Sequence, residues 1–180
     1  MPIIEKVLST GHYVNTTAEI TEKFEKKIAA LCNTKYALTL NSGTDALFFA
    51  LYLLNVRRGD EVVTVPNSFI STTAVIVHLG AKPIFVDVGQ DQNIDVNLLE
   101  KAITKKTKAI LPVHLSGRIV NMNKIMKIAK KYNIPVIEDA AQAIGSLYYN
   151  KPSGSFGKIG CFSTHPLKNL NACGDGGFIT

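Results

Sequence analysis

Residues 36–65, YALTLNSGTDALFFALYLLNVRRGDEVVTV, contain the pattern that decides the fold. A short apolar run ends in the turn Asn41-Ser42-Gly43-Thr44, and residues 46–51 are then apolar enough to form a buried helix. A β-branched run follows at residues 61–65. The stretch therefore predicts a strand, a tight turn, a helix and a second strand, which together form a βαβ unit.

The same alternation continues on both sides of this unit. After an extended start, Thr16 and Glu19 have the spacing of a capping box, which predicts a helix running to Leu31. Further helices are expected over 68–79 and around 122–129, and further strands over 83–87, 108–113 and 134–139. Continuous Val/Ile runs are typical of strands covered on both faces. We therefore expect an α/β fold, a mostly parallel sheet with helices on both faces.

Composition excludes several classes of protein. The 180 residues, of which 46% are hydrophobic and 19% charged, suffice for the core of one domain, unlike a disordered tail or a miniature disulfide scaffold. No apolar run approaches the ~18–20 residues that span a bilayer, and the first residues lack a secretory signal. The three cysteines form no CxxC pair, so we expect reduced thiols and no metal site. These features predict a cytoplasmic protein without a membrane partner.

The net charge of +6 raises the question of an anionic partner. Lysines cluster within residues 101–108 and 124–131, both of which are predicted to be helices or their ends. Neither cluster has an Arg-rich strip or interleaved aromatic residues for stacking on bases. Solvated helix faces explain them better than a nucleic-acid site, so we expect no nucleic-acid partner.

Ligands of open parallel sheets bind beyond the carboxyl ends of the strands, so the polar residues there are candidates for chemistry. The turn from Asn41 to Asp45 offers a glycine, two hydroxyls and the N–H groups of a helix start, which together can hold a phosphate. It matches neither GxxxxGK[ST] nor GxGxxG. An ordinary helix cap at Ser42 or Thr44 is the alternative.

A carboxylate, Asp139, ends another apolar strand, and the amide Gln142 follows three residues later. A buried carboxylate needs a cationic or hydrogen-bonding partner, because it otherwise takes up a proton. A ligand with a protonated ring nitrogen would supply that partner. A helix cap is again the alternative for Asp139.

The densest constellation is CFSTHPLKNL at residues 161–170, followed by Gly174-Asp175-Gly176-Gly177. It places Lys168 between a strand and a glycine-rich turn, among small polar residues. A lysine in such a setting can form a Schiff base. For a lysine taken alone, a surface role remains the alternative.

The segments NSGTDAL, PNSFISTTAV, VHLSG, EDAAQAIG, CFSTHPLKNL and GDGG occur in this order. Together they resemble the DegT/DnrJ/EryC1/StrS family of nucleotide-sugar aminotransferases that depend on pyridoxal 5′-phosphate (PLP), from about Gly11 to the end. The resemblance implies the aspartate-aminotransferase-like fold, PLP fold type I. It also implies that residues 1–180 are the N-terminal portion of the PLP-binding large domain, without the C-terminal small domain, since family members run to about twice this length.

The resemblance also implies roles for single residues. Lys168 would hold the cofactor as a Schiff base and shuttle the proton, and Asp139 would pair with the pyridinium nitrogen. Gln142 would hydrogen-bond the cofactor's 3-oxygen, and Phe69 would stack on its ring. The residues implied to hold the phosphate are Gly43, Thr44, Asp45 and Ser163. His165 and Pro166 would shape the lysine loop.

The implied reaction moves an amino group from an amino acid, usually glutamate in this family, to a keto-sugar of a nucleoside-diphosphate sugar, in amino-sugar and surface polysaccharide biosynthesis. The resemblance implies a homodimer for the full-length form. The alternatives are an inactive or regulatory PLP-binding fragment and a PLP-dependent sugar dehydratase, in which histidine typically replaces the lysine; Lys168 argues against the latter. Ser116 departs from the aromatic residue of many relatives, and we expect a structural role for the nearby His114.

Overall fold

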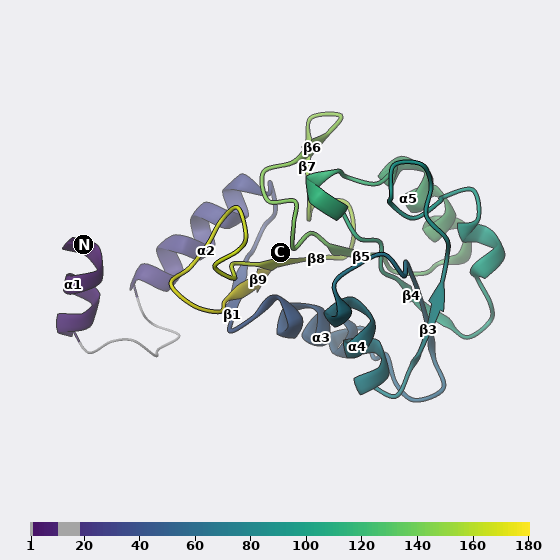
Figure 1. The fold of residues 1–180 in the computed structure, drawn as a ribbon, viewed down its shortest axis with the longest axis horizontal. Helices are drawn as coiled ribbons and strands as arrows, with labels where there is room; N and C mark the ends of the chain where they lie inside the picture. The colour runs from purple at the N-terminus through teal and green to yellow at the C-terminus, as the bar shows by residue number, and fades with distance from the viewer. Residues whose placement is uncertain (1, 11–18) are drawn as a thin grey trace.

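A β-sheet forms the centre of the computed structural model, which describes residues 2–10 and 19–180 (Figure 1). Its strands are β1 (Leu38–Leu40), β2 (Glu61–Thr64), β3 (Lys82–Phe85), β4 (Thr107–Ile110), β5 (Ile137–Asp139), β8 (Ile159–Ser163) and β9 (Gly177–Ile179). Hydrogen bonds connect β3-β2-β4 and β5-β8-β9-β1. Parallel bridges from Ile110 to Val136 and from Val113 to Asp139 join these two parts. The order across the sheet is therefore β3-β2-β4-β5-β8-β9-β1.

Most neighbouring strands are parallel, as the sequence predicts. β2 runs parallel to β3 and β4, and β5 runs parallel to β8. β9 is antiparallel to both of its neighbours, β1 and β8. The carboxyl ends of the parallel strands and the first residue of β9 therefore meet at one edge of the sheet.

Helices cover both faces of the sheet, which confirms the predicted layers. They are α2 (Glu19–Leu31), α3 (Gly43–Leu53), α4 (Ile70–His78) and α5 (Met122–Tyr132). In Figure 1, α3 and α4 lie on one side of the sheet and α2 and α5 on the other. Successive residues of β2 point to opposite faces of the sheet. Val62 packs with the apolar side chains of α3 and α4, whereas Val63 packs with those of α5.

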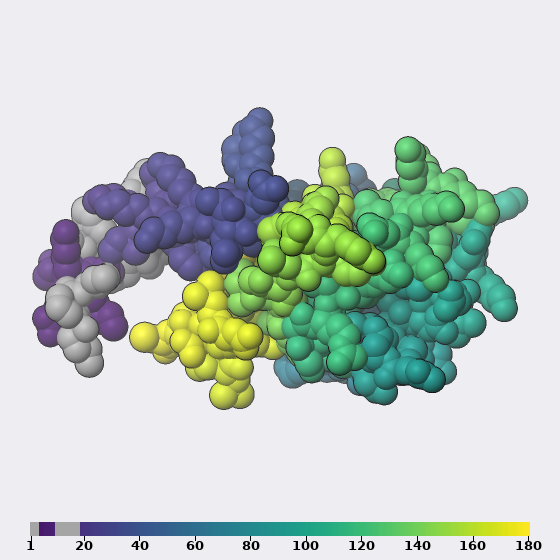
Figure 2. Space-filling view, turned by 90° about the horizontal axis from the view of Figure 1, so that it is seen from above, coloured from purple at the N-terminus to yellow at the C-terminus, as the bar shows by residue number. Residues whose placement is uncertain are grey.

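The N-terminal segment differs from the expectation. Residues Pro2–Thr10 form a helix, α1, and not an extended start. Its apolar residues recur at helical spacing, which is the signal in the sequence for this helix. Figures 1 and 2 show α1 at one end of the molecule, outside the layers of the sheet. Thr16, the expected cap of α2, lies outside the described residues.

The helix predicted at residues 46–51 is buried along one side only. Ala46, Leu47, Ala50 and Leu51 are buried against the sheet, whereas Phe49 is 40% exposed. Buried and exposed residues therefore alternate along α3 as they do in a helix that lies on a sheet. Although the sequence is apolar throughout, one side of the helix still faces away from the sheet. Among the residues that the structure describes, no helix has the length and apolar composition needed to cross a membrane.

A short hairpin, β6 (Leu147–Tyr148) and β7 (Lys151–Pro152), was not predicted from the sequence. Its turn residues Tyr149 and Asn150 have φ values of 48° and 60°. Both values lie in the left-handed region of backbone conformation. Two successive residues in the left-handed region give a turn whose twist matches that of the strands it joins. Figure 1 shows the hairpin extending away from the sheet.

The close approach of β9 to the start of α3 makes a stability prediction. A Cβ at Gly177 would lie 2.5 Å from the backbone carbon and oxygen of Ser42, whereas one at Gly174 would have no neighbour within 4 Å. We expect Gly177→Ala to lower the free energy of unfolding by about 1–3 kcal/mol, because backbone atoms must move. The matched Gly174→Ala should change it by less than about 0.5 kcal/mol. Urea unfolding measures both; equal effects would contradict the packing described.

Candidate active site

A pocket of about 490 Å³ opens at the edge of the sheet where the parallel strands end. It is bordered by the residue that ends β5, by the last residue of β8, by the first turn of α3 and by the segment between β2 and α4. The residues predicted for the site that line it are Gly43, Thr44, Phe69, Asp139, Gln142, Ser163 and Lys168. Segments far apart in the sequence thus supply one cavity.

Asp45 is the predicted site residue that the pocket lining does not include. Its backbone N–H donates to the Ser42 hydroxyl at 3.0 Å, which makes Ser42 the N-cap of α3. The cap uses the N–H that was expected to hold a phosphate. Gly43 and Thr44 precede it in the first helical turn, where backbone N–H groups have no acceptor within the helix and can bind an anion.

Hydroxyl groups gather around this helix start. A Cβ at Gly43 would lie 2.6 Å from Cβ of Ser163, so the absent side chain lets α3 approach the end of β8. The Thr44 and Ser71 hydroxyls are 2.8 Å apart. The Ser163 hydroxyl accepts the His165 N–H at 3.3 Å, which leaves its own proton free to donate. An anion bound at the N-terminus of α3 would meet these donors.

Three polar residues of the pocket, Ser68, Ser71 and Thr72, were missed from the sequence. Ser71 and Thr72 lie in the first turn of α4, and Ser68 precedes the N-cap residue of that helix. Their spacing of three and four residues is the signal that could have identified them. Ser68 and Thr72 have their hydroxyl oxygens 2.7 Å apart. The first turn of α4 and the residue before its N-cap therefore present hydroxyl groups to the pocket.

Asp139 is the buried charge of this pocket, with 4% of its surface exposed. Its Oδ2 accepts from the Thr72 hydroxyl at 2.7 Å and its Oδ1 from the Ala141 N–H at 3.2 Å. Burial raises the pKa of Asp139, while the hydrogen bonds from Thr72 and Ala141 and the positive charge of Lys168 oppose this rise. No helix follows Asp139, so it is not a helix cap.

Lys168 lies in a loop between β8 and β9 and is partly buried at the pocket. Its N–H donates to the His165 carbonyl at 2.8 Å, and the His165 Nδ1 accepts the Leu167 N–H at 3.1 Å. The loop is closed where the Ala172 N–H donates to the Thr164 carbonyl at 2.8 Å. His165 therefore shapes the lysine loop, as the resemblance implies, and its Nε2 lies 3.8 Å from Asp175 Oδ1.

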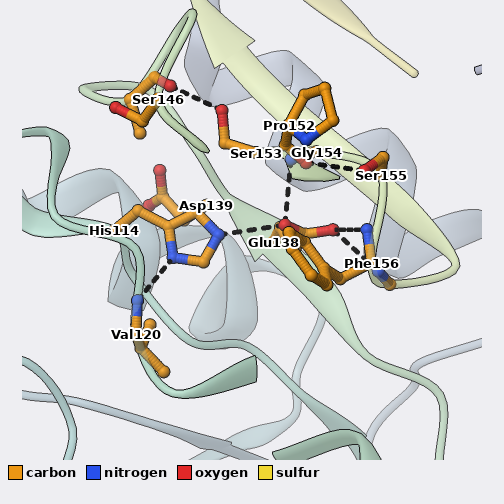
Figure 3. A network of polar contacts seen from close by, with 12 residues as sticks. His114, Val120, Glu138, Asp139, Ser146, Pro152, Ser153, Gly154, Ser155 and Phe156 are labelled. Carbon is orange, nitrogen blue, oxygen red and sulfur yellow. Dashed lines mark hydrogen bonds and ion pairs between the residues drawn. The ribbon is translucent and has the colours of Figure 1, made fainter. Parts of the chain in front are cut away.

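A buried network fixes the strand that ends in Asp139 (Figure 3). His114 Nε2 donates to Glu138 Oε2 at 3.0 Å, and its Nδ1 accepts the Val120 N–H at 3.4 Å. Because a backbone N–H can only donate, the ring proton of this tautomer lies on Nε2. Glu138 also accepts the N–H groups of Gly154, Phe156 and Gly157 at 2.9, 2.7 and 2.7 Å. His114 is thus a structural residue, as expected.

Comparison with known proteins identifies the family. The family model described as the DegT/DnrJ/EryC1/StrS aminotransferase family matches residues 2–180. The chain belongs to this family. UDP-2-acetamido-2-deoxy-3-oxo-D-glucuronate aminotransferase of Pseudomonas aeruginosa is 43% identical over 177 residues, which are 98% of this chain and 49% of that protein. The chain spans about half the length of the curated relatives it matches.

Solved structures of the DegT/DnrJ/EryC1/StrS family have the same fold. DesV of Streptomyces venezuelae superposes with a TM-score of 0.94 at 38% identity, over 98% of this chain and 47% of that one. The PLP form of Spr1654 from Streptococcus pneumoniae superposes with a TM-score of 0.89 at 34% identity, over 98% of this chain and 49% of that one. This confirms the aspartate-aminotransferase-like fold, and it shows that a relative with this architecture binds PLP.

The raised pKa of Asp139 makes a prediction for the protein without a ligand. The folded chain holds the carboxyl proton of Asp139 more tightly than the unfolded chain does. The free energy of unfolding should therefore fall as the pH rises from 3.8, the ordinary pKa of an aspartate, through the pKa of Asp139 in the folded chain. Asp139→Asn should then be more stable than the wild type at neutral pH, by about 1.4 kcal/mol for each pH unit between the two pKa values. The difference should vanish in acid. Urea unfolding at several pH values tests this, and a pH-independent difference would contradict it.

Proposed function

We propose that this chain is the cofactor-binding portion of the large domain of a PLP-dependent aminotransferase. Its substrates are a nucleoside-diphosphate sugar with a keto group and an amino acid, probed first with glutamate. The observation on which the proposal rests is that Lys168 and the buried carboxylate of Asp139 line one pocket beside the N-terminus of α3. The Pseudomonas relative, named for its action on a UDP-linked keto-sugar, supports this substrate class.

The residues of the pocket fit PLP. A buried carboxylate with a raised pKa favours a cationic ligand atom, and the protonated ring nitrogen of PLP is such an atom. The open N–H groups of α3 and the hydroxyls of Thr44 and Ser163 suit its phosphate. Phe69, 66% exposed and part of the pocket wall, offers an aromatic face for the ring. When bound, PLP supplies an electron-withdrawing ring that stabilises negative charge at the substrate carbon.

The protein's own contribution is orientation and proton transfer. Asp139, oriented by the Thr72 hydroxyl and the Ala141 N–H, keeps the ring nitrogen protonated. Lys168 would hold the cofactor covalently, and as a free amine it would move the proton between the substrate carbon and the C4′ carbon of the cofactor. Gln142 donates to the 3-oxygen. Lys168 at the pocket disfavours the sugar dehydratase.

The proposal for Lys168 is tested by trapping. The chain is incubated with an equimolar amount of PLP, reduced with borohydride and mapped by mass spectrometry. We expect the adduct on Lys168, its loss in Lys168→Ala, and its retention in Lys158→Ala, since Lys158 is exposed and is not part of the pocket. Lys168→Ala should also lower the rate of amino transfer at least about 100-fold, as expected for loss of the proton-transferring group.

An adduct that persists in Lys168→Ala would contradict the proposed role of this lysine. A wild-type chain that forms the adduct but transfers no amino group from glutamate would favour the inactive or regulatory PLP-binding fragment instead. The two readouts therefore separate cofactor binding from activity.

We also propose that the protein forms a homodimer in the cytoplasm. All three cysteines are free, in keeping with a reducing compartment. α3 and α4 pack side by side and present apolar residues outward, and these are Phe49, Tyr52, Leu53, Ile70 and Val77. An exposed apolar group of this kind on two adjacent helices is typical of a protein interface.

The dimer proposal predicts a difference between two exposed leucines. Leu53 on α3 is 60% exposed and Leu147 on the β6–β7 hairpin is 62% exposed. Leu53→Asp should shift the chain to monomer, because it places a charge within the apolar face, whereas Leu147→Asp should not. Sedimentation equilibrium measures both variants. A wild-type monomer at all concentrations, or a dimer unaffected by Leu53→Asp, would contradict the proposed interface.

A further inference from the structure

The orientation of Gln142 is set by a backbone turn behind it. Residues Leu115–Gly117 form the short 3-10 helix η2, and the Ser116 N–H donates to Gln142 Oε1 at 2.9 Å. Since an N–H can only donate, the oxygen end of the amide faces the turn. The –NH₂ end of Gln142 is then the one that can donate to a ligand in the pocket, which Gln142 lines.

The turn itself has an unfavourable backbone conformation. Ser116 has a φ of 51° and Gly117 a φ of 81°, both in the left-handed region. A residue other than glycine in this region is strained and persists only where its surroundings hold it. The contacts that hold the turn therefore decide where the Ser116 N–H lies.

The buried side-chain amide of Asn93 forms hydrogen bonds to both ends of the turn. Its Oδ1 accepts the Leu115 N–H at 3.1 Å, and its Nδ2 donates to the Arg118 carbonyl at 3.0 Å. Asn93 is 1% exposed and is distant from Gln142 in the sequence. Both hydrogen-bonding ends of one side chain are thus used on either side of Ser116.

Two further contacts make the turn rigid. The Ser146 hydroxyl donates to the Gly117 carbonyl at 2.7 Å. The residue before the turn, His114, donates its N–H to the Asp139 carbonyl at 2.9 Å and is fixed by Glu138 (Figure 3). Asn93 is itself held, because its carbonyl accepts the Gly89 N–H at 2.8 Å. A continuous chain of hydrogen bonds therefore runs from the loop before Ile94 to the pocket.

We propose that Asn93 is a positioning residue of the active site: through the Leu115–Arg118 turn it holds Gln142 so that its –NH₂ group donates to an anionic ring oxygen of the ligand. The inference rests on the proposed function, in which that oxygen is the 3-oxygen of PLP. A donor at this place stabilises the deprotonated, anionic form of the bound cofactor. Loss of Asn93 should weaken that donor without removing any group that touches the ligand.

The experiment follows the absorbance of PLP bound to the full chain as a function of pH. In Gln142→Ala the absorbance change that accompanies deprotonation should move to higher pH by about 0.5–1 pH unit, the size of one lost hydrogen bond. Asn93→Ala should move it in the same direction. The double variant should move it no further than Gln142→Ala alone, because Asn93 acts through Gln142.

A second variant and a control distinguish the proposed role of Asn93 from a general loss of stability in Asn93→Ala. Asn93→Asp keeps an acceptor for the Leu115 N–H but loses the donor to the Arg118 carbonyl. The pH of the absorbance change should therefore lie between those of the wild type and Asn93→Ala. Before cofactor is added, the Ser116 N–H of this variant should exchange its hydrogen faster than in the wild type. The control is Asn121→Ala. Asn121 accepts the Lys124 N–H and the Tyr148 hydroxyl at 3.1 and 3.0 Å, so its loss should lower stability and leave the titration unchanged.

An Asn93→Ala or Asn93→Asp protein that titrates as the wild type while Gln142→Ala is displaced would overturn the inference alone. Additive displacements in the double variant would do the same. A wild-type chain that binds no PLP would overturn the proposed function and this inference with it.

Discussion

A carboxylate buried at the end of a β-strand is the constraint on which the site depends. Asp139 is almost fully enclosed, and two neutral donors, the Thr72 hydroxyl and the Ala141 N–H, are its hydrogen-bond partners. Neutral donors offset only part of the cost of burying a charge, so burial still raises the pKa of this group. A cationic ligand atom beside Asp139 would offset the rest of that cost. The protonated ring nitrogen that we propose for PLP meets that requirement.

The rest of the architecture places other groups around this point. Because β5 and β8 are parallel neighbours, Asp139 and Ser163 end at the same edge of the sheet. The antiparallel strand β9 lies between β8 and β1 and brings Gly177 against Ser42, the N-cap of α3. The N-terminus of α3 and the lysine loop thereby meet across one pocket. Behind Asp139, the His114–Glu138 network ties the strand to the loop after the β6–β7 hairpin, so that the carboxylate has a rigid support.

The sequence predicted most of the fold and most of the residues that were expected to line one pocket. Val/Ile runs separated by helical spacing predicted the parallel sheet and its two helix layers. The polar residues at strand ends, together with the family resemblance, predicted seven residues that line the pocket, Gly43, Thr44, Phe69, Asp139, Gln142, Ser163 and Lys168. The failures have physical reasons. The backbone N–H of Asp45 was expected to donate to a phosphate, but it donates to the Ser42 hydroxyl. Which of the two acceptors it meets depends on the geometry of the helix cap. Thr72 and Asn93 act on residues far away in the sequence, and such contacts follow from tertiary packing and not from local pattern.

In the proposed function, Asp139 keeps the ring nitrogen of bound PLP protonated. The ¹⁵N chemical shift of PLP labelled at that nitrogen and bound to the chain tests it most directly, because the shift reports the protonation state without reference to activity. We predict a protonated nitrogen that persists to a higher pH than in free PLP in the wild type, and an unprotonated one in Asp139→Asn. A nitrogen that loses its proton at the same pH in the bound and the free cofactor would contradict the account.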